Sequence, residues 1–235
     1  MTISGLGSAL VFLNNALYNE MRGSAATNTE SCLKIQLALA ISAGGRLQVS
    51  HNTLTAQGTA PLEFVFALGT TTLSSGAGIE VSGNTLNVTA PGVVSLYYFI
   101  GAVSITDSSI SVISNNVTQL GENCLLLLFV STLSLGSQSA FSVTNNTFSM
   151  EGQYIAIFYS VGVVLVDSDS AMSVVSNACL FTINATGTVS VAASVFLFST
   201  NVYVTNRGGI STEANIFQAN LVNPQLNAGL VLVSC

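Results

Sequence analysis

One asparagine recurs along the chain in a fixed apolar context, and this repeat constrains the fold more than any other feature. Successive copies are 37, 32, 31, 31, 31 and 38 residues apart. The seven copies are Asn15, Asn52, Asn84, Asn115, Asn146, Asn177 and Asn215. A period near 31 residues indicates a repeat architecture, in which each unit buries its apolar side against the next unit.

The residues before each asparagine alternate between apolar and polar. In the fourth unit, Ile110 and Val112 are apolar and Ser111 between them is polar. A period of two residues is typical of a strand with one face buried and the other in solvent. Each unit is therefore expected to hold a half-buried strand directly before its asparagine.

The asparagine itself is expected to form a corner. Val112 and Val117 are both apolar but five residues apart, an odd interval that would put them on opposite faces of a continuous strand. Asparagine suits a corner because it tolerates the left-handed conformation and its amide can bond nearby backbone. Amides stacked on successive turns are also expected to hydrogen-bond to one another as a ladder.

Two further apolar stretches follow in each unit, such as residues 93–100 and 103–105. We therefore predict an all-β fold: a right-handed, single-stranded parallel β-helix of about seven turns of ~31 residues, with three strands per turn. The right hand follows from the handedness rule for parallel crossovers. Propeller blades need longer repeats, and leucine-rich repeats are shorter and carry helix. Residues 1–235 are expected to form a single domain.

The ends of the sequence suggest a segment of a longer array. The first unit begins within ten residues of Met1, and the chain stops at Cys235 after the apolar run 230–233. Repeat arrays need polar caps at their ends. Without caps, the chain is expected to expose adhesive ends and to associate end to end.

Composition and charge exclude two classes of function. Only 6% of residues are charged and 49% are hydrophobic, yet no stretch reaches the roughly 20 apolar residues of a membrane-spanning helix. The net charge is −6, and the four basic residues Arg22, Lys34, Arg46 and Arg207 are scattered. Nucleic acid binding needs a basic stripe, so it is excluded. Residues 1–17 show no signal peptide.

Cysteine and histidine give no sign of a metal, cofactor or disulfide. The cysteines are Cys32, Cys124, Cys179 and Cys235, and the closest two are 55 residues apart (179 − 124), nearly two turns. They are expected to be small buried hydrophobic residues, because metal-site spacings are absent. His51 precedes Asn52 and is expected to be a solvated corner residue.

Carboxylates offer the one enzymatic alternative. Asp107 and Asp169 both lie eight residues before their asparagines, Gln138 holds the same place between them, and Asp167 is close. Carboxylates on nearby turns would suit a pectin-lyase-like lyase or hydrolase acting on polysaccharides. Asp, Gln and Gly are also the residues expected in a bend. We therefore expect no enzyme and assign no catalytic, cofactor or metal residues.

Four Asn-x-Ser/Thr sequons are present, at Asn87, Asn116, Asn145 and Asn184. They permit N-glycosylation in a secreted protein. Their number is close to what chance predicts in a chain this rich in asparagine, serine and threonine. They therefore do not by themselves indicate glycosylation.

The motif V-S-G-N-T-L at residues 81–86 and V-x-x-N-N at 112–116, in a charge-poor background, resembles the dispersed gene family of very large trypanosome surface proteins. The similarity runs from Leu10 to Cys235. Pectin-lyase-like β-helices and bacterial adhesin passenger domains share a related corner. The resemblance implies a cell-surface or secreted protein with a repetitive ectodomain, suspected of adhesion to host matrix or glycans. In the family, a membrane segment far downstream provides the anchor. No catalytic residue carries over.

Overall fold

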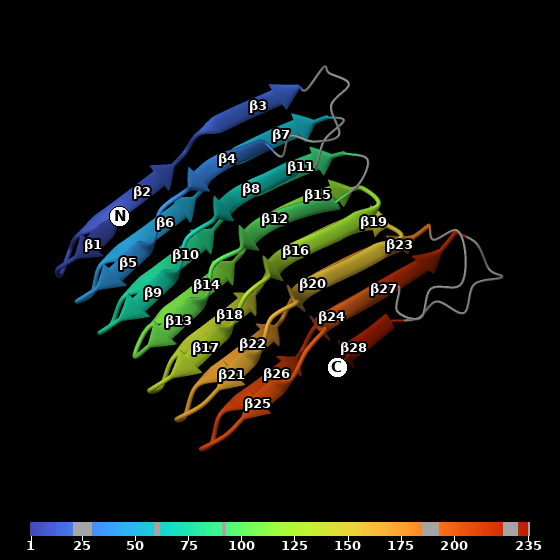
Figure 1. Ribbon diagram of the computed structural model, residues 1–235. Coiled ribbons are helices and arrows are strands. Elements are labelled where there is room, and N and C mark those ends of the chain that lie inside the picture. Colours follow the sequence, from blue (N-terminus) through green and yellow to red (C-terminus); the bar gives the residue numbers. More distant parts are fainter. Residues whose placement is uncertain (21–29, 59–61, 91–92, 185–192, 223–229, 235) are drawn as a thin grey trace.

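The chain is a parallel β-solenoid with a period of about 31 residues (Figure 1). The computed structural model describes residues 1–20, 30–58, 62–90, 93–184, 193–222 and 230–234. Within these residues all 28 regular elements are strands, none is a helix, and they form four parallel sheets of seven strands each. No helix in this part of the chain is long and apolar enough to cross a membrane.

Each sheet takes every fourth strand of the chain. Sheet A contains β1 (Thr2–Ser4), β5 (Leu39–Ser42), β9 (Thr71–Ser74), β13 (Val103–Thr106), β17 (Leu133–Gly136), β21 (Val164–Val166) and β25 (Val202–Val204). Sheet B contains β2 (Ala9–Leu13), β6 (Arg46–Ser50), β10 (Gly78–Ser82), β14 (Ser109–Ile113), β18 (Ala140–Thr144), β22 (Ala171–Val175) and β26 (Gly209–Glu213). Sheet C contains β3 (Ala16–Glu20), β7 (Thr53–Gln57), β11 (Thr85–Thr89), β15 (Asn116–Leu120), β19 (Thr147–Gly152), β23 (Ala178–Ile183) and β27 (Ile216–Leu221). Sheet D contains β4 (Glu30–Ile35), β8 (Leu62–Ala67), β12 (Val93–Phe99), β16 (Asn123–Phe129), β20 (Tyr154–Ser160), β24 (Ala193–Phe198) and β28 (Leu230–Ser234).

The expectation of three strands per turn is wrong, because each repeat contributes four. The strand that the sequence reading missed is the one in sheet C, directly after the asparagine. In β11, for example, Leu86 and Val88 are buried while Thr85 and Asn87 are exposed. This alternation makes it a half-buried strand in its own right.

The alignment of repeats made on the asparagine gives the observed strand register. Ile79 of β10 pairs with Ile110 of β14, and Val81 pairs with Val112. Apolar residues therefore stack on apolar residues from one repeat to the next, and the polar residue between them stays on the outer face.

The left-handed corner residue is the one before the asparagine, so the expectation that the asparagine itself adopts this conformation is wrong. Ser114 has φ 55° and precedes Asn115. The residue before each of the other six asparagines is left-handed too, namely Asn14, His51, Gly83, Asn145, Ser176 and Ala214. This residue points outward at the corner, which leaves the asparagine side chain free to point inward.

The asparagine side chains form the expected hydrogen-bonded ladder between sheets B and C. The Nδ2 atom of Asn84 donates to Oδ1 of Asn115 at 2.9 Å, and the backbone N–H of Asn84 donates to the same oxygen at 3.0 Å. The same Nδ2 also donates to the carbonyl of Val49 at 2.8 Å. Bonds of this kind join all seven asparagines. The ladder therefore holds neighbouring repeats in register inside the β-solenoid, which is called the coil below.

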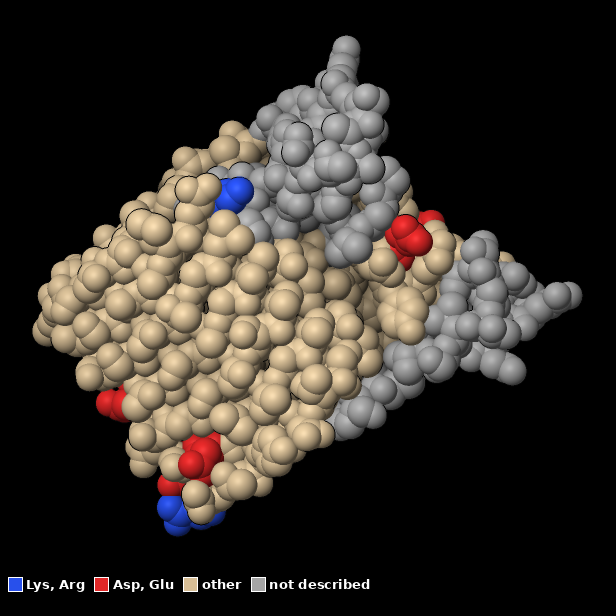
Figure 2. Space-filling view, viewed as in Figure 1, with Lys and Arg blue, Asp and Glu red and all other residues tan. Residues whose placement is uncertain are grey.

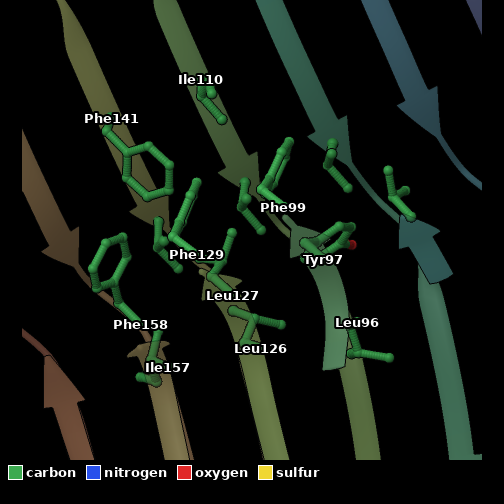
Figure 3. Close-up of a cluster of buried hydrophobic side chains, with 14 of the residues drawn as sticks. Leu96, Tyr97, Phe99, Ile110, Leu126, Leu127, Phe129, Phe141, Ile157 and Phe158 are labelled. Atoms are coloured by element: carbon green, nitrogen blue, oxygen red, sulfur yellow. The ribbon is translucent and has the colours of Figure 1, made fainter. Parts of the chain in front are cut away.

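The interior is one continuous apolar cluster that extends from Ile3 to Phe198. Figure 3 shows its aromatic part, contributed by several strands. The rings of Phe99 and Phe129 stack with centroids 4.9 Å apart, and those of Phe129 and Phe158 with centroids 5.1 Å apart. These separations are close to the roughly 4.8 Å spacing of neighbouring strands, so rings from successive repeats stack along the interior.

The connection between sheets C and D absorbs almost all variation in repeat length. Only residues 121–122 separate β15 from β16, whereas residues 21–29 separate β3 from β4 and residues 184–192 separate β23 from β24. These longer connections account for the two long spacings in the sequence repeat.

Candidate functional site

The corner between sheets A and B carries the acidic column that the sequence singles out. Gly44, Gly76, Gln138, Asp169 and Arg207 are all left-handed there, with φ between 60° and 78°. Asp169 and Arg207 of neighbouring repeats form a two-point ion pair, with Nε to Oδ1 at 2.6 Å and Nη2 to Oδ2 at 2.6 Å. Both carboxylate oxygens of Asp169 are thus engaged by the guanidinium.

Asp107 lies in a turn that differs from that of Asp169. Residues 107–108 separate β13 from β14, whereas residues 167–170 separate β21 from β22. Asp107 is the only left-handed residue of its turn, and its N–H is shared between the carbonyls of Gly136 and Ser137. The backbone therefore holds the carboxyl groups of Asp107 and Asp169 in different geometries.

Asp167 accepts a hydrogen bond from Oγ1 of Thr205 at 2.8 Å. This bond, and a further one from the Asn206 side chain, lower the pKa of the Asp167 carboxyl below its ordinary value. A glycosidase acid needs the opposite shift, so that it holds a proton near neutral pH. The hydrogen bonds and the ion pair at this corner therefore favour a structural role for its aspartates.

A shallow pocket of about 310 Å³ opens between the ends of sheet C and the starts of sheet D. Its polar lining consists of Glu122, Gln153, Asn184 and Thr89, and its apolar lining includes Leu120. One carboxylate stands alone among amides and a hydroxyl. This set can hydrogen-bond a polyhydroxylated ligand but offers no pair of groups for acid–base chemistry.

The outer face of sheet C presents a regular, uncharged array of hydroxyl and amide groups. We name it the hydroxyl–amide face; it comprises the first two outward residues of each of β7, β11, β15 and β19, and the third outward column, Gln57, Thr89, Leu120 and Glu151, lies beside it. The strands pair in register, so these residues form two columns along the coil. The eight residues, all exposed or half-buried, are Thr53, Thr55, Thr85, Asn87, Asn116, Thr118, Thr147 and Ser149. Neighbours in a column are about 4.8 Å apart, and the columns are about 6.7 Å apart.

Sequence reasoning missed this face because it merged the strand after the asparagine into the corner. The signal was present in segments such as 53–57 and 85–89, where threonine or asparagine alternates with leucine, valine or alanine. The array ends at β23, whose outward residues include Ala178 and Leu180. Charged side chains are also few on the side of the molecule shown in Figure 2 and lie mostly near its rim.

The four sequons all lie on or beside sheet C. Asn87 and Asn116 belong to the hydroxyl–amide face, Asn145 is an exposed residue at the corner before β19, and Asn184 directly follows β23. A glycan attached to Asn87 or Asn116 would cover part of this face.

Histidine and cysteine occupy the places expected for them where the structure describes them. His51 is exposed and left-handed at its corner, φ 54°. Cys124 and Cys179 are free and buried, and burial raises the pKa of both thiols to about 12. The side chain of Cys32 and all of Cys235 lie outside the described part of the chain. Across the described residues, no three His, Cys, Asp or Glu side chains are grouped as metal ligands.

Comparisons with protein-family models, with curated proteins and with solved structures find no match to this chain.

Proposed function

We propose that the protein is a structural and adhesive module of a cell-surface or secreted protein, and that it binds neutral glycans or matrix through the hydroxyl–amide face. In this proposal the coil makes seven right-handed turns and acts as a rigid support. The resemblance of its repeat to large trypanosome surface proteins supports a surface location. The array on sheet C is the observation that carries the binding proposal.

The chemistry of the face suits neutral polyhydroxylated ligands. Its eight side chains can donate and accept hydrogen bonds but carry no charge, so they give no preference for ionic ligands. A single exposed hydrogen bond contributes little, because water competes for both partners. Hydrogen-bonding groups at fixed spacing on the protein can contact one extended ligand at several points, and their joint affinity exceeds that of any one contact.

Binding also requires a rigid face, because a flexible array of side chains would lose conformational entropy when the ligand binds. The buried asparagine ladder runs along the edge of sheet C, directly before each of its strands from β3 to β27. It fixes the axial position of every strand relative to the next. The spacing of the hydroxyl–amide face is therefore set by the interior of the coil.

The test is binding to immobilised neutral polysaccharides and matrix proteins, using protein made without glycosylation. The variant Thr85→Val, Thr118→Val removes two hydroxyls while keeping the size and β-branching of the side chains. We expect at least a tenfold loss of binding. The control Ser111→Ala, Ser142→Ala makes a comparable change on the outer face of sheet B and should bind like the original chain. Equal losses in both variants, or no binding to any neutral glycan, would overturn the proposal.

The enzymatic alternative is checked with lyase and hydrolase assays on pectic and other acidic glycans. Turnover by the unmodified chain that is lost in the variant Asp107→Asn, Asp169→Asn would show that the protein is an enzyme and would contradict the adhesion proposal. We expect no turnover in either protein.

A further inference from the structure

Exposed apolar side chains gather at the two ends of the coil. Among the described residues, nine of the thirteen exposed large hydrophobic residues belong to residues 1–17 or 203–222. Leu17 is 39% exposed and its equivalent Phe217 is only partly buried, whereas Val117, at the same position in the middle of the coil, is fully buried. The end repeats therefore hold core-type residues that lack a covering layer in the described structure.

In the outermost strands of sheet B, β2 and β26, every second residue directs its backbone N–H and carbonyl away from the neighbouring strand. The N–H of Asn14 donates to Ser50 and the carbonyl of Ser8 accepts from Arg46, so even-numbered residues of β2 face β6. In a parallel pair, successive residues bond to opposite sides. The N–H and carbonyl of Val11 therefore lie on the free edge. By the same reasoning from Gly209 and Ser176, the groups of Ile210 lie on the free edge of β26.

The asparagine ladder has a direction, which makes its two ends chemically complementary. Asn15 donates from Nδ2 to Asn52, and its own Oδ1 accepts no hydrogen bond from a described residue. At the other end, Nδ2 of Asn215 has no next asparagine and donates to Oγ1 of Thr212 at 2.9 Å. Thr212 replaces the valine found at this position in five repeats, Val49, Val81, Val112, Val143 and Val174. Its hydroxyl thus serves as a substitute acceptor for the last amide.

We propose that the 235-residue chain associates head to tail with further copies of itself, in the register that places Asn15 of one copy on Asn215 of the next. In this register Asn215 Nδ2 donates to Oδ1 of Asn15 in the second copy, and β2 adds to β26. The N–H of Val11 then donates to the carbonyl of Ile210 in the neighbouring copy, as Arg46 donates to Ser8 within one chain. Phe217 and Leu17 would cover each other in the same way as Phe148 and Cys179 do.

The two faces differ, so the contact is heterologous and does not close on itself. Association should therefore give linear assemblies whose length grows with concentration. Each contact would also continue the outer faces of sheets A, B and C from one copy to the next.

The test combines sedimentation velocity with two edge variants. Val11→Pro removes an unpaired N–H from the free edge of β2. Ala219→Pro does the same on β27, because the N–H groups of Ile216 and Val222 bond to the β23 side and that of Ala219 therefore lies on the free edge. Proline is tolerated at such edge positions because no existing hydrogen bond is lost. Circular dichroism and melting at low concentration establish that both variants fold.

We expect oligomers from the unmodified chain, monomers from each variant alone, and a 1:1 dimer without longer species when the variants are mixed. A monomeric unmodified chain up to several hundred micromolar would overturn the proposal. Dimerisation of either variant alone would overturn it as well, because it would show a contact between like faces. Thr212→Val removes the substitute acceptor of Asn215 and should strengthen association several-fold. Unchanged association in this variant would refute the proposed register.

Discussion

The side chain of Asn115 donates from Nδ2 to Oδ1 of Asn146 across 2.9 Å, with both residues no more than 2% exposed. Each Oδ1 of the ladder from Asn52 to Asn215 accepts from the side chain and the backbone N–H of the preceding asparagine. Buried amides are stable only when such bonds are made. Several groups from adjacent repeats therefore depend on each asparagine.

Replacing Asn115 or Asn146 with leucine should lower the free energy of unfolding by about 3 kcal/mol or more, because buried partners lose their bonds. For Asn115 these partners are the Asn84 amide and the Val81 carbonyl. Urea unfolding followed by circular dichroism measures the change. The matched control is Ser111→Thr with Ser142→Thr, on the half-buried outer face of sheet B, where a change within about 0.5 kcal/mol is expected. Similar losses in both sets would contradict the structural role of the ladder.

Tyr97→Phe should stabilise the protein. The Tyr97 hydroxyl is buried and has no hydrogen-bond partner in the described part of the chain, and burial raises the pKa of this hydroxyl well above its ordinary value. The Tyr97 ring borders a small internal cavity of about 20 Å³ whose wall is apolar. A buried water needs two to four polar partners, and the cavity wall supplies none. Removing the hydroxyl should therefore raise the free energy of unfolding by about 1 kcal/mol or more. A destabilised Tyr97→Phe protein would show that the hydroxyl has a partner.

Gly101→Ala should destabilise the coil at the turn between sheets D and A. A Cβ atom on Gly101 would lie 2.3 Å from the carbonyl oxygen of Gly69 in the preceding repeat, so backbone would have to move. A cost of about 1–3 kcal/mol is expected from such overpacking. Gly136→Ala is the control, because a Cβ atom there meets nothing within 4 Å. Thermal melting of the two variants compares them directly, and equal melting temperatures would exclude the predicted clash.

Cys124 and Cys179 should resist thiol reagents in the folded protein and react once it is unfolded. The measurement uses a Cys32→Ser, Cys235→Ser background, so that the colour change with Ellman's reagent reports only the two buried thiols. Their pKa values are raised from 9.0 to about 12 in the folded state. Between pH 9 and 12 the unfolded chain ionises and the folded chain does not, so stability should fall as pH rises through this window. Fast labelling of native protein at pH 8 would contradict the burial of these thiols.

Much of the fold could be predicted because the repeat encodes register directly. Apolar alternation before the asparagine fixes which residues face inward, and the observed pairing of Val81 with Val112 follows from it. The odd interval from Val112 to Val117 located the corner but not its left-handed residue. Position 114 and its equivalents are Asn, His, Gly, Ser or Ala, a mixture without an evident signal. In the structure this position is exposed in six of the seven repeats and half-buried at Gly83.

The candidate site was harder to predict than the fold. The column of Asp107 and Asp169 was visible in the sequence, but the difference in length between their turns depends on where each strand ends. The hydroxyl–amide face required knowing that residues such as Thr85 and Asn87 belong to a strand and not to a bend. Counting alternation on both sides of the asparagine would have revealed that strand.

The length of each repeat is adjusted almost entirely between sheets C and D, where one residue separates β19 from β20 and residues 184–192 separate β23 from β24. Neighbouring strands keep their register on both sides of these insertions. The coil therefore has a built-in graft point: a foreign peptide spliced after Leu120 should be carried on the surface without disturbing the stack. Graft points in successive repeats would lie along one side of the molecule at the strand spacing, so that attached groups would be held at fixed distances from one another.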